Sequence, residues 1–316
     1  MNIYSSRYSG LTILAGIVVL LFAFESGAVS KNGFVLDDAL IPAEEIFDGG
    51  PGRDGIPSLD YPDFVAADEA GFLKAKDRVL GIEIDGVARA YPIRILNYHE
   101  IVNDAFAGQG LVVTYCPLCN SGIAFDARAG GSRLEFGVSG LLYNSDVLLY
   151  DRQSHSLWSQ IEKTAVSGPM KGTKLEALPM THTTWRDWVA RYPDTEVLSD
   201  KTGFRRNYKS DPYLGYRRTG SLMFPVAEQN PEYRRKSLVM GLEIDGHFKA
   251  YPFSELKKSP PQFTDQFQGQ EYEVRFDKKN DTASVVNAEG DELPVLIAYW
   301  FAWYAFHPDA EVFAAD

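Results

Sequence analysis

The sequence has little positive charge, few cysteines and no long apolar run. Its 316 residues include 31 Lys and Arg against 43 Asp and Glu, a formal net charge of −12. This balance argues against a nucleic-acid binder, because neutralising phosphates needs a basic face. Phosphate loops, dinucleotide fingerprints and a Ser-His-Asp order are also missing, so no nucleotide cofactor is expected. With 45% hydrophobic residues, the aromatic 13% included, the chain has the composition of an ordinary globular protein.

The amino terminus has the pattern of a signal peptide. Arg7 precedes an apolar run from Leu11 to Phe24, which is shorter than the roughly 20 residues of a comfortable membrane span. Small residues follow at Ser26-Gly27-Ala28, as signal peptidase requires. We therefore predict a Sec-type signal peptide over residues 1–28 and a periplasmic or otherwise extracytoplasmic protein. The alternative is an uncleaved anchor, and only in that case is a membrane a partner.

An internal repeat is the most informative feature of the chain. Residues 79–86 (VLGIEIDG) return as residues 239–246 (VMGLEIDG), and Ala90-Tyr91-Pro92 returns as Ala250-Tyr251-Pro252. Each copy alternates apolar and polar residues on both sides of Asp-Gly, which predicts a β-hairpin.

A second repeated block follows each hairpin. Trp185 and Trp188 are matched by Trp300 and Trp303, and the spacing of their apolar neighbours predicts a short helix in each copy. The fold class predicted from these blocks is α+β, with two related hairpin-plus-helix units and mainly antiparallel sheet. The distance from hairpin to helix is longer in the first copy, so we expect an inserted segment there that carries the cysteines.

Five segments are predicted from these boundaries. They are a signal peptide (1–28), an N-terminal extension that packs on the core (29–77), a first repeat unit with the Cys-Pro-Leu-Cys insert (78–200), a crossover segment (201–236) and a second, degenerate repeat unit (237–316). The second unit has no cysteine, and it has Ser259-Pro260 where the first has His99-Glu100. Function is therefore expected in the first unit. The paired arginines of the crossover segment fit a solvated surface or an anion-binding groove.

Several stretches resemble one known family. They include Asn97 to Asp104, Thr114 to Cys119, Phe136 to Ser145 and Leu157 to Gln160. These stretches are similar to the uncharacterised prokaryotic exported proteins grouped as domain of unknown function 3179 (DUF3179). The resemblance implies membership of that family, and it brings no settled activity.

Cys116 and Cys119, the only cysteines, allow three interpretations. In the first they form a metal knuckle for zinc, copper or iron, with His99 as the leading further ligand and His182 as the next, or with ligands from a second chain. In the second they exchange disulfides, although the following Asn120-Ser121-Gly122 leads into a strand, whereas redox motifs of this type open a helix. In the third they form a small structural disulfide, which an oxidising compartment permits.

The polar and aromatic stretch from Phe136 to Gln160 is a candidate cleft. Asp146 and Asp151 are candidate acid–base groups or metal ligands, and the aromatic side chains can flank a ring-shaped substrate. The alternative is a pair of strands joined by a turn at residues 144–146. The cleft candidates are Asn120, Tyr143, Asn144, Asp146, Tyr150, Asp151, Trp158 and Gln160.

The leading functional hypothesis is an exported metal-binding, redox-capable envelope protein of unknown substrate. The first alternative is a thiol–disulfide oxidoreductase that uses Cys116 and Cys119. The second is a non-catalytic envelope module that binds a small molecule or glycan. In each case the expected partner is a small molecule or an envelope component and not a nucleic acid, and whether the protein is an enzyme stays open.

Overall fold

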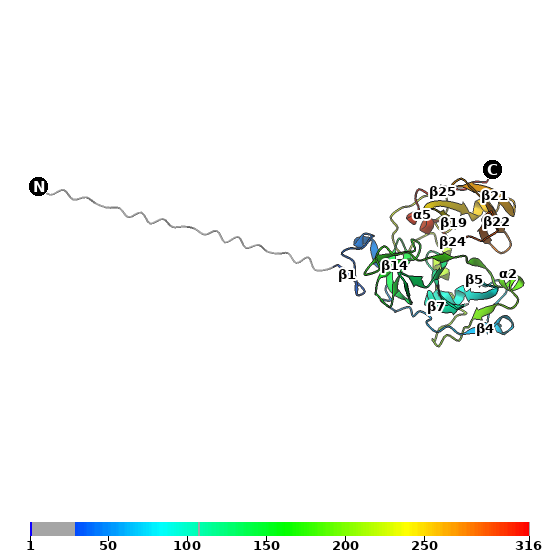
Figure 1. Cartoon of the computed structure of the whole chain (residues 1–316), viewed down its shortest axis with the longest axis horizontal. Helices are drawn as coiled ribbons and strands as arrows, with labels where there is room; N and C mark the ends of the chain where they lie inside the picture. Colours follow the sequence, from blue (N-terminus) through cyan, green and yellow to red (C-terminus); the bar gives the residue numbers. More distant parts are fainter. Residues whose placement is uncertain (2–28, 107, 316) are drawn as a thin grey trace.

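The computed structural model describes Met1, residues 29–106 and residues 108–315. The predicted signal peptide lies, apart from Met1, outside these described residues. The protein is mostly β, with 41% strand and 13% helix, and five larger sheets take a five-bladed β-propeller arrangement (Figure 1). The prediction of an α+β fold made of two hairpin-plus-helix units is therefore wrong. None of the helices in the described ranges is long and apolar enough to cross a membrane.

The first two sheets come from residues 64–198. The first sheet, in the order β17-β5-β6-β18-β4, contains β4 (Phe64–Ala66), β5 (Arg78–Ile84), β6 (Val87–Pro92), β17 (Thr181–Thr184) and β18 (Glu196–Leu198). The second sheet, in the order β16-β9-β8-β7, contains β7 (Ile101–Phe106), β8 (Gln109–Cys116), β9 (Ser121–Asp126) and β16 (Ala177–Leu178).

The other three sheets complete the arrangement. The third, in the order β15-β14-β13-β12-β3, contains β3 (Ile46–Asp48), β12 (Phe136–Tyr143), β13 (Asp146–Asp151), β14 (Leu157–Ser159) and β15 (Thr164–Ser167). The fourth, in the order β24-β19-β20-β25, contains β19 (Leu238–Ile244), β20 (His247–Pro252), β24 (Val295–Tyr299) and β25 (Glu311–Val312). The fifth contains β21 (Gln262–Phe267), β22 (Gln270–Asp277) and β23 (Thr282–Val286).

Short elements connect these sheets. Two small hairpins are formed by β1 (Ser30–Lys31) with β2 (Phe34–Val35) and by β10 (Arg128–Ala129) with β11 (Ser132–Arg133). The helical elements are η1 (Ala43–Glu45), η2 (Ala67–Glu69), α1 (Ile93–His99), α2 (Trp185–Arg191), α3 (Leu214–Arg218), α4 (Phe253–Leu256) and α5 (Trp300–Phe306).

The sequence repeat corresponds to a repeat of sheet topology. The order β17-β5-β6-β18 in the first sheet returns as β24-β19-β20-β25 in the fourth. In both, the fourth of these strands runs parallel to the third: β18 to β6 and β25 to β20. The second and fifth sheets each contain a three-stranded antiparallel meander, which follows α1 in one unit and α4 in the other. Each unit therefore supplies two sheets, and the third sheet has no counterpart.

Strands β12 to β15 of the third sheet are the insertion in the first unit, and β3 joins them from the N-terminal extension. The Cys-Pro-Leu-Cys turn joins β8 to β9, and the turn between β22 and β23 holds the same position in the fifth sheet. The prediction that the inserted segment carries the cysteines is therefore wrong. The cysteines belong to a meander that both units share, and the extra chain begins after β9, with β10.

Two glycines explain why α2 packs on the β5–β6 hairpin in the same way as α5 packs on the β19–β20 hairpin. Gly81 pairs with Ala90, and Gly241 pairs with Ala250. A Cβ at Gly81 would overlap the indole ring of Trp188, and a Cβ at Gly241 would overlap that of Trp303. Each helix therefore lies directly on its hairpin because the strand beneath it lacks a side chain at that point.

The substitution Gly81→Ala is expected to destabilise the fold by about 3 kcal/mol, since the added methyl group forces the buried Trp188 ring out of place. Urea unfolding measures this change. Gly71→Ala is the matched control, because a Cβ at Gly71 has no neighbour within 4 Å. Equal stability of the two variants would contradict the packing argument.

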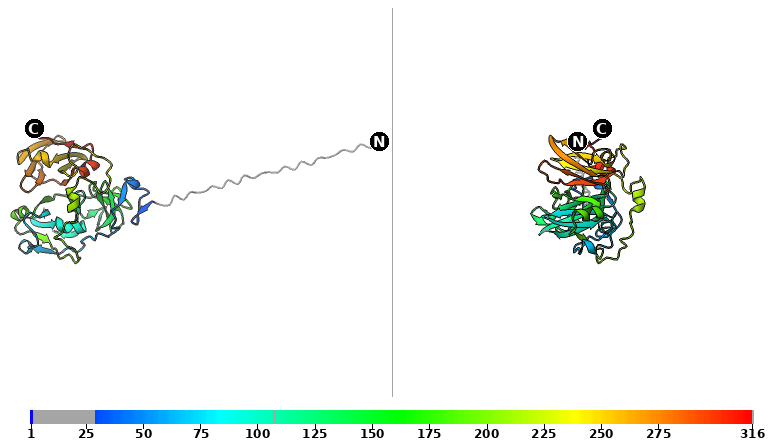
Figure 2. Two further views of the ribbon diagram at one scale, coloured as in Figure 1. Left: turned by 180° about the vertical axis from the view of Figure 1, so that it is seen from behind. Right: turned by 90° about the vertical axis from the view of Figure 1, so that its right-hand side faces the viewer.

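Polar contacts join the sheets into one body. The Asn103 amide donates to the backbone oxygen of Phe136 (2.8 Å) and links the second sheet to the third. Thr282 Oγ donates to Thr183 Oγ (2.6 Å) and links the fifth sheet to the first. In Figure 2 the second unit, coloured yellow to red, lies against the first, and the crossover segment runs along one side of both.

Candidate metal centre

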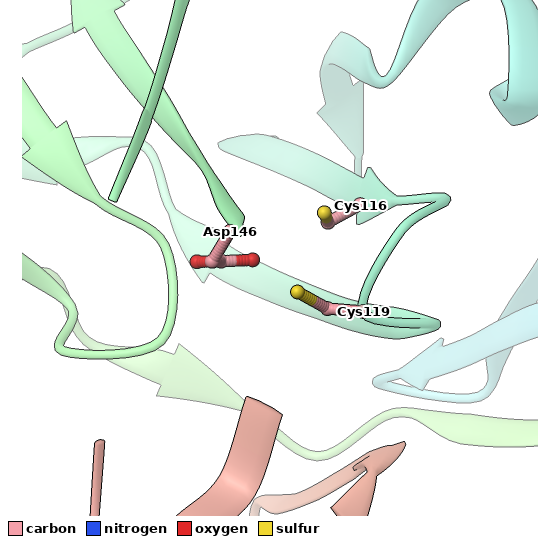
Figure 3. Close-up of side chains that lie close together, drawn as sticks. All are labelled: Cys116, Cys119 and Asp146. Atoms are coloured by element: carbon pink, nitrogen blue, oxygen red, sulfur yellow. The ribbon is translucent and has the colours of Figure 1, made fainter. Parts of the chain in front are cut away.

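Two tight turns from different sheets meet at the cysteines. Cys116 ends β8, and Cys119 lies in the turn that leads into β9. Asp146 begins β13, directly after the turn that joins it to β12. The two sulfur atoms and a carboxylate oxygen of Asp146 all lie within 4.8 Å of one another, and all three side chains are buried (Figure 3). This is a compact group of two soft donors and one hard donor.

The turn before Asp146 has an uncommon backbone. Asn144 and Ser145 both have positive φ values, 49° and 65°. Asn tolerates this region, but Ser adopts it rarely, so the turn is strained. The backbone oxygen of Ser145 lies 3.2 Å from the Cys119 sulfur and 3.8 Å from the Cys116 sulfur, where it accepts from the thiols. The buried Ser145 hydroxyl has no hydrogen-bond partner within the described part of the chain.

A chain of buried polar side chains orients Asp146. Its Oδ1 lies 3.3 Å from the Ser121 hydroxyl, which in turn donates to Gln160 Oε1 (2.6 Å). The Gln160 amide donates to the Thr114 hydroxyl (2.8 Å). The backbone amide of Ile161 donates to Asp146 Oδ2 (3.3 Å). Such a network around a donor group fixes its direction, as supporting residues do in metal sites.

Burial raises the pKa values of all three side chains in this group. Desolvation raises the pKa of the Cys116 thiol, and it raises the pKa of Cys119 further because Cys116 lies beside it. Desolvation also raises the pKa of Asp146 to about 7. Without a bound cation the group therefore favours its neutral, protonated forms. A cation would compensate the burial of the deprotonated forms.

The two histidines expected as ligands lie outside this group. His99 Nδ1 lies 2.8 Å from the backbone oxygen of Pro57, and its Nε2 lies 2.5 Å from the Tyr208 hydroxyl, so both ring nitrogens are occupied. His182 is buried on β17, where desolvation lowers its pKa well below the usual value. Neither belongs to the cluster of donor atoms, in which Asp146 is the third member.

Four of the cleft candidates do lie close to the cysteines. Asp146 belongs to the donor group and Gln160 to the chain that orients it. Asn144 forms the strained turn, where its side chain accepts from the backbone amide of Ala227 (2.8 Å). Asn120 lies in the cysteine turn with φ 56°.

The other four cleft candidates make structural contacts apart from the donor group. They are Tyr143, Tyr150, Asp151 and Trp158. The Asp151 carboxylate accepts from the Trp158 indole nitrogen (2.9 Å) at the far end of β13 from Asp146. The Tyr150 hydroxyl donates to Asp54 (2.5 Å). Tyr143 packs edge-on against Phe306 with the ring centroids 5.6 Å apart. The stretch from Phe136 to Gln160 is the pair of strands and the turn that formed the alternative prediction, together with β14.

Sequence reasoning missed Glu100 as a site residue. It follows α1 with a positive φ of 59° and is buried. Desolvation, with a further contribution from nearby Asp146, raises the pKa of Glu100 to about 8. The only sequence signal was the replacement of His99-Glu100 by Ser259-Pro260 in the second unit. The left-handed backbone at Glu100 is a tertiary feature that no periodicity reveals.

Fold and site together define a class: a mostly β protein with five larger sheets and a buried group of two Cys-x-x-Cys thiols and an aspartate between two turns. The chain belongs to the family described as protein of unknown function (DUF3179), whose model matches residues 53–296. The resemblance noted from the sequence is thereby confirmed, and the matched range contains all three donor residues. No curated protein and no solved structure matches the chain.

Proposed function

We propose that this protein binds one transition-metal ion through Cys116, Cys119 and Asp146. The observation that carries the proposal is the approach of the three donor atoms to within 4.8 Å in a buried site. Two thiolates and a carboxylate suit zinc, which accepts sulfur and oxygen donors in tetrahedral geometry. Copper or iron in the same site would make it redox-active.

Three protein ligands leave one position of a tetrahedral ion open. Structural zinc sites usually have four protein ligands, whereas catalytic sites keep the fourth position for water or substrate. The buried Ser145 hydroxyl, which has no partner within the described residues, and the raised pKa of Asp146 both support a cation at this site, because a positive charge would offset the burial of polar and ionisable groups. We therefore favour a reactive centre over a purely structural knuckle.

The thiol chemistry of the site favours metal binding over disulfide exchange. Exchange needs an accessible thiolate, but Cys116 is 1% exposed, Cys119 is 0% exposed, and burial raises the pKa of both thiols. Both cysteines are free, so a bracing disulfide has no support either. The amino-terminal pattern of a signal peptide supports the proposal that this metal protein is exported and acts in the envelope.

The test is metal loading of the reduced, chelator-treated protein. Zinc content by mass spectrometry should reach one ion per chain, and cobalt should give a thiolate charge-transfer band. A reduced, folded wild-type protein that takes up none of zinc, cobalt, copper and iron would overturn the proposal. Loading by copper or iron alone would mean that the proposed site binds one of these ions and not zinc.

A pair of matched variants tests the carboxylate ligand. Asp146→Asn should lower zinc affinity about 10- to 100-fold, because the amide is a weaker donor without charge. Asp151→Asn changes an equally buried aspartate that contacts Trp158, so it should leave zinc affinity unchanged while lowering stability. Competition with a chromophoric chelator measures both affinities. An equal loss of affinity in the two variants would remove Asp146 from the ligand set.

A further inference from the structure

A cavity of about 110 Å³ lies against the proposed metal centre and contains an unpaired acid. Cys116 and Glu100 both form part of its wall. Glu100 is 6% exposed, no described residue makes a hydrogen bond to its carboxyl, and its oxygens are not among the fully enclosed unpaired atoms, so the carboxyl borders open space at the cavity. A buried carboxyl without a partner is costly, so its position at a cavity indicates a ligand that supplies the missing contact.

The rest of the wall is mainly apolar. The third sheet contributes Val138, Leu141 and Val147, and the crossover segment contributes Met223 and Phe224. Met223 is 57% exposed, so the cavity borders solvent at this point. The volume is somewhat smaller than that of an engineered cavity of about 150 Å³ that holds benzene, so it suits a molecule of about five heavy atoms.

The composition of the wall selects against charged ligands. Apolar side chains do not solvate an anion or an ammonium group, and no arginine or lysine lines the cavity among the described residues. Burial raises the pKa of Glu100 to about 8, so this acid is largely protonated at neutral pH and able to donate a hydrogen bond.

We infer that the cavity is the substrate pocket of the metal centre, an inference that rests on the proposed function. Its ligand is a small neutral molecule with a short apolar chain and one donor atom, such as a thiol or alcohol. The donor atom occupies the open position on the metal beside Cys116 and lies next to Glu100, and the chain fills the space between Leu141 and Phe224.

The experiment uses the cobalt-loaded full chain and two thiol probes of similar length. 1-Propanethiol should shift the visible cobalt bands saturably, and 2-mercaptoethanesulfonate should bind at least tenfold more weakly, because its sulfonate would enter the apolar wall. Ile56→Trp, from the loop at the cavity edge, and Phe224→Trp, from the crossover segment, fill the space and should each weaken 1-propanethiol at least tenfold. Met223→Ala widens the solvent-facing edge and should change affinity less than threefold.

Cobalt content after gel filtration is measured for every sample, which separates the two proposals. Failure to load cobalt in the wild type overturns the metal centre itself. Full cobalt content without any response to 1-propanethiol overturns only the substrate pocket. Equal affinity of the two thiols, or unchanged affinity in both tryptophan variants that retain cobalt, also overturns it.

Discussion

The double variant Cys116→Ser, Cys119→Ser should lose its zinc entirely while it keeps its fold. Zinc binds thiolates, and a serine hydroxyl does not deprotonate near neutral pH, so the variant retains only the Asp146 carboxylate as an anionic donor. We expect the zinc affinity to fall at least 1000-fold, beyond detection by stoichiometric loading. This loss is the largest effect that the structure predicts for any change at the site.

The fold should survive because the thiols serve few structural contacts. The polar neighbours of the two thiols are the backbone oxygen of Ser145, the other thiol and Asp146, and a serine hydroxyl can donate to the same acceptors. Without metal the stability of the double variant should therefore lie within about 2 kcal/mol of the wild type. The near-UV circular dichroism spectrum checks that the aromatic core around the turn is intact.

Zinc should separate the two proteins in thermal unfolding. A ligand that binds only the native state raises stability by mass action, so excess zinc should raise the Tm of the wild type and leave that of the double variant unchanged. Stoichiometric zinc in the double variant would mean that the ion binds elsewhere. In that case Cys116, Cys119 and Asp146 would not be the zinc ligands.

The sequence predicts those parts of the fold that depend on residues close to one another in the chain. The two hairpins follow from alternation around Asp85-Gly86 and Asp245-Gly246, and β5 pairs with β6 in the same register as β19 with β20. The helices that contain Trp188 and Trp303 follow from their apolar spacing. The α+β class failed because short helices have a strong periodic signal, whereas the inserted strands from Phe136 to Ser167 have apolar residues on both faces and little alternation.

The candidate metal centre was predictable only in part for a similar reason. The Cys-x-x-Cys spacing identified two donors, but the third depends on how the third sheet docks on the second. Asp146 reaches the thiols through a left-handed turn at Asn144 and Ser145, which the sequence shows merely as turn-forming residues. His99 looked like a better ligand, yet Pro57 and Tyr208 occupy its nitrogens through contacts distant in the chain.

In the absence of metal, the protein should lose stability as the pH rises from 6.5 to 8, and Glu100→Gln should reduce this loss. Burial raises the pKa of Glu100 in the folded protein to about 8, above its ordinary value of 4.5. Unfolded chains therefore release this proton near pH 4.5, whereas the folded protein keeps it until about pH 8. The stabilisation is complete below the lower value and is lost as pH approaches the higher one.

The size of the effect follows from the linkage between proton binding and folding. One proton held only by the folded state changes stability by about 1.4 kcal/mol per pH unit. Glu100 should thus contribute about 2 kcal/mol of loss between pH 6.5 and 8, and Asp146, whose pKa is raised to about 7, should add a smaller part at the lower end. The ordinary pKa of histidine lies at the lower edge of this window, so the three buried histidines with lowered pKa values, His99, His182 and His307, each add an opposing gain of about 0.4 kcal/mol, mostly below about pH 7.5. This gain is the same in the wild type and in Glu100→Gln, so the difference between the two slopes still reports Glu100.

Urea unfolding with a chelator at several pH values between 6.5 and 8 measures the slope. Glu100→Gln removes the titrating group while it keeps the shape of the side chain, so its slope should be about 1.4 kcal/mol per pH unit shallower than that of the wild type. Glu289→Gln changes an exposed glutamate and serves as the matched control with the wild-type slope. Parallel slopes for Glu100→Gln and the wild type would mean that Glu100 is ionised and compensated in the folded protein. The cavity would then contain a charge, and its preference for neutral ligands would be lost together with this prediction.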